Sequence, residues 1–176
     1  PIDTRTASTE IVTPVLFQAG AQILMEALPL WVQGGISPRP QDNSQATITK
    51  KLKKNDGEAR WQEPAKVLER RLRAFTPWPG LFSYWHGRTL KILSAEPLMY
   101  DIDQSGYSNV ENIPPNFPDE LAPGLVVLMN KQDSTMGVVT GKGVLEIKSL
   151  QLEGRRPVSA EEFLRGHREF PGSILP

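Results

Sequence analysis

The stretch RRLRAFTPWPGLFSYWHGRTLKILSAE, residues 70–96, decides the fold because the spacing of its apolar residues changes at Gly80. Before Gly80, apolar residues recur every three or four positions, which is typical of one face of a helix. The residues on this face are Ala65, Leu68, Leu72 and Phe75. After Gly80 the pattern alternates, which predicts a β-hairpin that turns at residues 86–88. The sequence therefore predicts a helix that leads directly into a β-domain.

The corner between helix and hairpin is Pro77-Trp78-Pro79-Gly80. Proline cannot continue a helix, so this corner is expected to end the helix and turn the chain. A large aromatic ring between two prolines is more often packed than exposed, so Trp78 is expected to act as a plug between helix and strands. The neighbouring aromatic residues Phe82, Tyr84 and Trp85 could stack on nucleic-acid bases.

Two further segments, GLVVLMN (124–130) and STMGVVTGKGVLEIKSLQLEG (134–154), predict three more strands. Between Ile147 and Leu150 the apolar phase shifts, so one residue near Lys148 is extra, as in a β-bulge of a bent strand. A capping box formed by Ser159 and Glu162 predicts a short final helix. The expected fold class is mainly β with flanking helices, with an OB-like, five-stranded Greek-key barrel.

The chain before this domain divides into a helix and a linker. TPVLFQAGAQILMEAL predicts a helix that begins at Thr13-Pro14 and ends near Pro29. The polar, glycine- and proline-containing segment that follows is typical of a linker. We expect residues 1–38 to be the end of a preceding domain, 39–62 a basic linker, and 63–176 the β-domain. Residues 97–124 are expected to form a long surface excursion.

Charge is unevenly distributed although the formal net charge is zero. The segment 39–73 holds ten basic residues against five acidic ones, a net charge of +5. The segment 94–130 holds six acidic residues and no Lys or Arg. The segment 39–73 therefore has a positive local field although the whole chain is neutral, which favours a polyanionic partner for this segment.

Several function classes find no support in the sequence. The absence of cysteine excludes disulfides and thiolate metal sites, and His86 and His167 are far apart, so no metal is expected. No glycine-rich phosphate loop or nucleophile motif is present, and no catalytic residue is predicted. No apolar run is expected to be long enough to span a bilayer, so no membrane partner is expected.

The basic residues of the helix form a second face. Lys66, Arg70 and Arg73 share this face and follow the lysine run KKLKK, a pattern that can neutralise successive phosphates of RNA or DNA. The simpler alternative is a solvated face whose cations pair locally with Glu63 and Glu69. The predicted barrel favours the nucleic-acid interpretation.

Three segments carry a resemblance to a known family: PQDNSQATITKKLKKNDGEARW, VLERRLRAFTPWPG and GVLEIKSLQLEGRRPVSAEEFLRG. In order and spacing they resemble the C-terminal part of methionyl-tRNA formyltransferases. The resemblance implies a Rossmann-like catalytic domain upstream, whose last helix would be the first helix of this chain. It also implies the linker and an OB-like C-terminal domain.

The resemblance implies an activity for the whole protein. That activity is transfer of a formyl group from 10-formyltetrahydrofolate to the methionine amino group of initiator methionyl-tRNA, in the cytoplasm of a bacterium or in the mitochondrial matrix. The family's Asn-x-His and Ser-Leu-Leu-Pro motifs do not occur here. We therefore expect no catalytic or cofactor-binding residue in this chain, no activity of the chain alone, and a monomer whose partner is the initiator tRNA.

The resemblance also assigns a tRNA-facing role to basic positions of the linker, the helix and two turns. These are Lys50, Lys51, Lys53, Lys54, Lys66, Arg70, Arg71, Arg73, Lys142, Arg155 and Arg156. Two departures from the family pattern are Arg60, where an acidic residue is usual, and the acidic segment 96–120. Carboxylates near a phosphate-binding face would repel RNA, so that segment is expected either to point away or to change the docking.

Three other interpretations remain open at this stage. Related formyltransferases act on a sugar nucleotide, and folate dehydrogenases join similar domains to a dehydrogenase domain. A non-enzymatic RNA-binding module of the OB type is a second alternative. A structural scaffold, in which the basic face pairs with the acidic segment, is a third.

Overall fold

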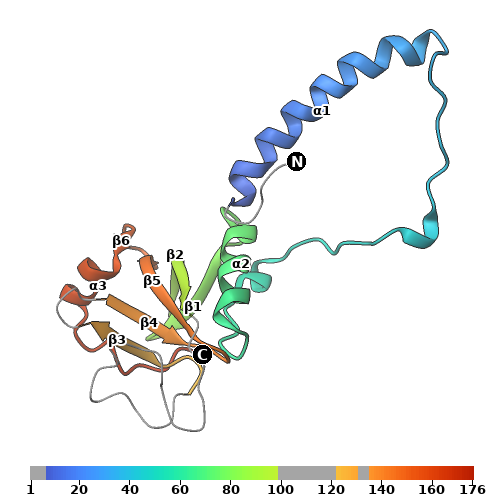
Figure 1. Cartoon of the computed structure of the whole chain (residues 1–176). Coiled ribbons are helices and arrows are strands. Elements are labelled where there is room, and N and C mark those ends of the chain that lie inside the picture. The colour runs from blue at the N-terminus through green and yellow to red at the C-terminus, as the bar shows by residue number, and fades with distance from the viewer. Residues whose placement is uncertain (1–6, 99–121, 131–134) are drawn as a thin grey trace.

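The computed structural model describes residues 7–98, 122–130 and 135–176 and shows one long helix, an extended connection and a packed unit of helices and sheet (Figure 1). The elements in chain order are α1 (Thr9–Val32), η1 (Asn43–Gln45), η2 (Lys54–Gly57), α2 (Ala65–Phe75), β1 (Leu81–Trp85), β2 (Arg88–Leu98), β3 (Val126–Asn130), β4 (Thr135–Val139), β5 (Val144–Leu152), β6 (Val158–Ser159) and α3 (Ala160–Gly166). The predicted excursion falls mostly outside the described residues.

The strands form one antiparallel sheet in the order β1-β2-β5-β4-β3, with the short β6 paired to β5. The predicted hairpin is confirmed, and its turn lies at His86 and Gly87, which both have positive φ, 49° and 73°. Positive φ at both central positions is the requirement of the hairpin turn that matches strand twist. The three further strands are also present in the predicted segments.

The predicted bulge is present between β2 and β5. Ile92 pairs with Leu150 and Ala95 pairs with Ile147, so Lys148 is the extra residue on β5. Leu93 is skipped on the opposite strand. A bulge increases the local twist and bends the strand, which lets the sheet curl around the core.

The sheet does not close into the predicted OB-like Greek-key barrel. Among the described residues, the edge strands β1 and β3 pair with other segments and not with each other. The C-terminal segment bonds β3, where Val126 N donates to Ser173 O at 2.9 Å, and reaches β1, where Ser83 Oγ donates to the Pro176 carbonyl at 3.0 Å. The exposed edges are thus satisfied by irregular segments, and the correct description is a curled, open sheet.

The core lies between α2 and the sheet. Ala65, Leu68 and Leu72 are buried as predicted, whereas Phe75 is only half-buried. The expectation for Trp78 is wrong: its residue surface is 57% exposed, and the core tryptophans are Trp61, at 1%, and Trp85, at 6%. The physical reason is that the buried member of the corner is Pro79, which anchors the chain and leaves the indole outside.

Residues 54–62, which the sequence assigns to the linker, pack against the edge of the sheet. Ala59 N donates to Phe82 O at 2.7 Å, and Ala59 and Trp61 belong to the core. Gly57 approaches the corner so closely that a Cβ there would lie 2.1 Å from Gly80 O. The packed unit therefore begins at η2.

Helix α1 extends beyond both predicted ends, and Pro14 and Pro29 therefore lie inside it. Each proline removes one N–H from the helix, and neither ends it here. None of its residues is buried. By length and composition α1 could cross a membrane, which corrects the expectation that no apolar run is long enough.

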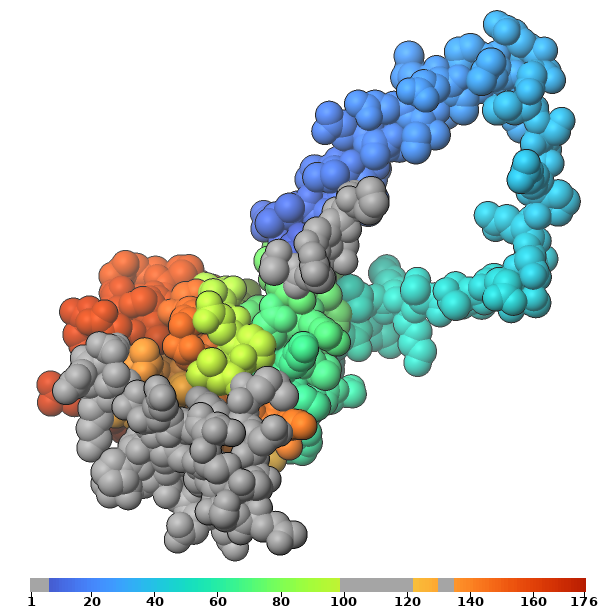
Figure 2. All heavy atoms as spheres, in the orientation of Figure 1, coloured from blue at the N-terminus to red at the C-terminus, as the bar shows by residue number. Residues whose placement is uncertain are grey.

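Helix α1 projects away from the packed unit (Figure 2). It meets α2 at its first residue, where Thr9 Oγ1 donates to Ala74 O at 2.6 Å. Residues 33–53 lead back to the sheet with η1 as their one short helix. Large apolar side chains of α1, such as Phe17 and Met25, are exposed.

Candidate nucleic-acid interface

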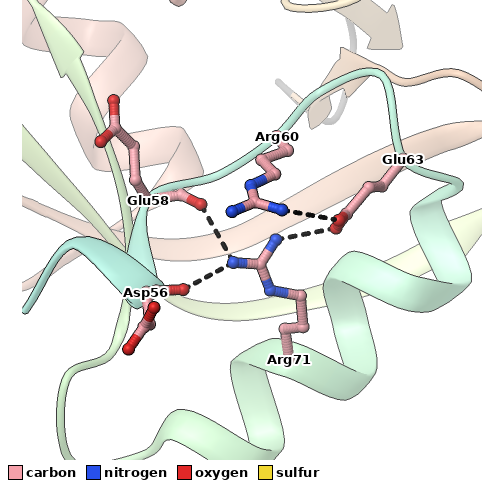
Figure 3. Close-up of polar contacts among 5 residues, drawn as sticks. All are labelled: Asp56, Glu58, Arg60, Glu63 and Arg71. Carbon is pink, nitrogen blue, oxygen red and sulfur yellow. Dashed lines mark hydrogen bonds and ion pairs between the residues drawn. The ribbon is translucent and has the colours of Figure 1, made fainter. Parts of the chain in front are cut away.

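The predicted contact residues divide into cations that pair with protein groups and cations that do not. Arg71 belongs to the first group (Figure 3). Its guanidinium donates to Glu63 Oε2 at 2.7 Å and to the carbonyls of Asp56 and Glu58 at 2.5 and 3.3 Å. Its side chain is only 17% exposed. Arg71 therefore fastens residues 56–58 to α2.

Arg73 and Arg156 also pair with carboxylates. Arg73 Nε donates to Glu69 Oε1 at 2.5 Å, and Arg73 Nη1 donates to Ala7 O at 3.2 Å. Arg156 Nη2 lies 2.5 Å from Glu162 Oε1 at the start of α3, and this pair is solvent-exposed. Each of these cations already faces an anion or a carbonyl, which lowers its availability for phosphate.

A second group of predicted residues is exposed, and no acceptor among the described residues pairs with their side chains. These are Lys50 and Lys51 of the linker, Lys66 and Arg70 of α2, and Arg155 after β5. Lys66 and Arg70 are four positions apart and so lie on one side of α2. Unpaired, exposed cations are the groups that can neutralise phosphates.

The turn between β4 and β5 is brought to the start of α2. Lys142 O accepts the N–H of Ala65 at 3.0 Å, and Pro64 bridges Lys142. Lys142 is exposed. The structure thus joins this turn to the helix that carries Lys66, although the two are far apart in sequence.

The linker lysines lie beside the Arg71 contact. A hollow there is lined by Lys50, Lys51 and Lys53 together with Arg60 and Phe75. Lys53 N donates to Asp56 Oδ2 at 2.6 Å, which sets the start of η2. Arg60, the departure from the family pattern, is 4.0 Å from Glu63 and remains exposed.

A pocket of about 340 Å³ lies beside Lys54, the first residue of η2. It is lined by Lys54, Trp78, Phe82, Lys91, Gln151 and Glu153. Lys91 did not stand out in the sequence, and Trp78 was expected to be packed. Strand alternation was the signal for Lys91, because its neighbours Leu90 and Ile92 are apolar and buried.

Glu153 is the acidic residue of this pocket. Its carboxylate accepts a hydrogen bond from Thr89 N at 2.9 Å. This hydrogen bond, with smaller contributions from Lys54 and Arg88, lowers the pKa of Glu153 below its ordinary value. The carboxylate is therefore ionised at neutral pH and partly offsets the charge of Lys54.

In the part of the chain that the structure describes, no three His, Asp or Glu side chains lie close enough together to hold a metal ion. His86 and His167 both contact the ring of Trp85, with ring centroids 4.3 and 5.0 Å away. Both pack on an aromatic residue, and His167 Nδ1 also lies 3.7 Å from Glu169 Oε1.

Comparison with known proteins places this chain in a family. Residues 51–168 match the family model described as formyl transferase, C-terminal domain. Methionyl-tRNA formyltransferase of Chloroflexus aurantiacus is 38% identical over 92% of this chain and 46% of its own length. Methionyl-tRNA formyltransferase of Roseiflexus castenholzii is 37% identical over 99% of this chain and 49% of its own length. The chain spans about half the length of these relatives.

Solved structures show a similar fold at low sequence identity. A variant of HypX from Aquifex aeolicus has a TM-score of 0.58 at 16% identity, covering 98% of this chain and 28% of HypX. HypX in complex with tetrahydrofolic acid has a TM-score of 0.52 at 17% identity, covering 85% of this chain and 23% of that protein. At such identities the likeness concerns the fold alone.

Proposed function

Since the chain belongs to the family of formyl transferase C-terminal domains, we propose that it is the tRNA-binding portion of a methionyl-tRNA formyltransferase. The observation that carries the proposal is the set of exposed, unpaired cations on the linker and α2. Lys50 and Lys51 line the hollow beside Arg71, whereas Lys66 and Arg70 line a second hollow between α1 and α2, and all four residues are exposed. The names of the relatives agree with a tRNA substrate.

Binding would be electrostatic and directed at the backbone of the tRNA. Lysine and arginine displace condensed counterions when they neutralise phosphates, so affinity falls steeply as salt rises. Such contacts position the nucleic acid without reading its sequence. Arg71 has a different role in this proposal, because its donors already hold residues 56–58 against α2.

Formyl transfer itself belongs, in this proposal, to the part of the relatives that the chain does not span. The donor would be 10-formyltetrahydrofolate and the acceptor the amino group of initiator methionyl-tRNA, in a bacterial cytoplasm. No residue of this chain is assigned to the folate. The uncovered apolar surface of α1 supports this division, because a helix that is apolar on several sides needs a partner to cover it.

The test is tRNA binding across a salt series. We expect the 176-residue chain to bind initiator tRNA, with log K falling linearly with log salt concentration. The combined variant Lys50→Gln, Lys51→Gln, Lys66→Gln and Arg70→Gln should make that slope shallower. At 150 mM salt the loss of affinity should be on the order of 10- to 100-fold. Arg168→Gln, which changes an exposed arginine after α3, is the matched control for the single variant Arg70→Gln.

Two results would contradict the proposal. One is the absence of tRNA binding at low salt. The other is an equal loss for Arg168→Gln and Arg70→Gln, since this would show that total charge and not the linker and α2 surface determines binding. Competition by a sugar nucleotide at low concentration would favour the related sugar-nucleotide formyltransferases instead.

A further inference from the structure

The pocket beside η2 has a regular floor. Phe82 pairs with Lys91 across β1 and β2, and Lys91 pairs with Gln151 across β2 and β5. Directly paired residues on neighbouring antiparallel strands point to the same face of the sheet. That face is opposite the core, because the neighbours of Lys91, Leu90 and Ile92, are buried within it. The floor is thus a row across three strands.

The wall of the pocket is an exposed indole on a fixed corner. Trp78 is flanked by Pro77 and Pro79, whose rings restrict the backbone, and Pro79 is buried. The Gly80 N–H donates to Phe75 O at 2.9 Å, which ties the corner to the end of α2. The 57% exposed Trp78 therefore presents an aromatic surface whose backbone is already ordered.

The polar groups of the pocket suit a ligand that carries both a negative charge and a ring with hydrogen-bonding groups. Lys54 and Lys91 are exposed and cationic. The Glu153 carboxylate accepts a hydrogen bond from Thr89 N and partly offsets the charge of Lys54, so Lys91 is the less neutralised of the two cations. Gln151 uses its amide nitrogen to donate to Arg155 O at 2.8 Å, which leaves the amide oxygen as an acceptor directed by that bond.

We propose that this pocket holds one unpaired nucleotide of the bound RNA, with its base stacked on Trp78 and its phosphate near Lys54 and Lys91. Bases of a continuous duplex are already stacked and cannot reach such a surface, whereas unpaired bases can. The face of an unpaired base stacks on an aromatic side chain, and nearby cations stabilise its phosphate. The inference deepens the proposed function and rests on it for the identity of the RNA.

The first experiment compares two tryptophans of similar exposure. Trp78→Ala should weaken binding of initiator tRNA roughly 5- to 160-fold, the range that corresponds to loss of one stacked base. Trp31→Ala is the matched control, because Trp31 on α1 is 51% exposed and lies outside the pocket. Trp78→Phe keeps an aromatic face and should restore most of the affinity. Unchanged urea midpoints would show that all three variants fold.

A second measurement separates stacking from charge. Trp78→Ala should leave the salt slope of binding unchanged, whereas Lys54→Gln with Lys91→Gln should make it shallower. In the Trp31→Phe background, Trp78 is the one tryptophan left with substantial exposure, since Trp61 and Trp85 are buried. Its fluorescence should then be quenched by a short single-stranded RNA oligonucleotide.

The outcomes distinguish this inference from the proposed function. If tRNA binds the wild-type chain and the Trp78→Ala variant equally, the pocket is wrong and the tRNA-binding role stands. If the oligonucleotide binds in a Trp78-dependent manner but tRNA does not bind, the pocket is supported and the tRNA assignment is overturned. If neither RNA binds at low salt, both are overturned.

Discussion

Helix α1 and the segment 54–62 differ in a way that their sequences do not suggest. The helix is rich in large apolar residues, yet it buries none of them in this chain. The shorter segment is mostly polar, yet it contributes Ala59 and Trp61 to the core. The exposed apolar residues of α1 therefore indicate a surface that a partner would cover. Residues 54–62 are packed because they lie beside an edge of the sheet.

The sheet edge explains this difference. An edge strand presents unpaired N–H and C=O groups, which are costly to leave uncovered beside a core. Residues 58 and 59 bond to β1, and residues 172–175 bond to β3 and its neighbour Gly124. The segment 54–62 is thus fixed by backbone hydrogen bonds and one large ring. Helix α1 is bonded to α2 through Thr9 in its first turn and through Ala7, which precedes it.

The sharpest way to break this comparison is the same substitution in both regions. Trp61→Ala should lower the free energy of unfolding by about 3–5 kcal/mol, because the ring is 1% exposed and leaves a cavity. Trp31→Ala should change it by less than about 0.5 kcal/mol, as surface substitutions do. Urea unfolding followed by circular dichroism measures both. A large effect at Trp31 would mean that α1 packs on the rest of the chain in solution.

The next prediction concerns two adjacent arginines of α2. Arg71→Met should destabilise the packed unit by about 1–3 kcal/mol, because it removes the donor to two backbone carbonyls and leaves Glu63, among the described residues, only its 4.0 Å contact with Arg60. Arg70→Met should have an effect within about 0.5 kcal/mol, because Arg70 is exposed. Limited proteolysis should show faster cleavage near residues 54–60 in the first variant only. Equal rates of proteolysis in the two variants would contradict the role of Arg71 in holding residues 56–58 against α2.

The sequence predicted those features that depend on local patterns. The apolar face of α2, the hairpin turn at residues 86–87 and the bulge at Lys148 follow from spacing over a few residues, and all are present. Trp61 is buried among residues distant in sequence, such as Ser83, whose Oγ accepts a hydrogen bond from the indole nitrogen at 3.4 Å and which is 22 positions away. No periodic pattern carries that information.

The candidate interface shows the same limit. Charge alone located the cations of the linker and α2, but it did not show which ones are paired. Arg71 pairs with Glu63 at a separation of eight positions, which no helical spacing rule covers. Trp78 was assigned to the interior because tryptophan between prolines is usually packed. The buried residue of the corner is instead Pro79, and the open sheet could not be foreseen from the strand count.

The smallest expected change in the free energy of unfolding concerns a lysine of the sheet, compared with a lysine of the linker. Lys148 Nζ lies 2.6 Å from Glu146 Oε1 and 3.5 Å from Glu96 Oε2, and Glu146 is nearly buried. Because the Lys148 side chain is 42% exposed, water screens the interaction. Lys148→Met should therefore cost only about 0.5–1 kcal/mol. Lys51→Met, in the exposed linker, should cost nothing measurable.

The pH dependence of this pair has a defined sign. The hydrogen bond to Glu146 raises the pKa of Lys148 above its ordinary value. The folded state thus binds the proton more tightly than the unfolded state, and the stabilisation is complete below the unfolded pKa of about 10.4. It is lost as pH rises through the folded pKa. The difference in unfolding free energy between wild type and Lys148→Met should consequently shrink between pH 7 and pH 11, and a difference that grows over this range would contradict the pairing.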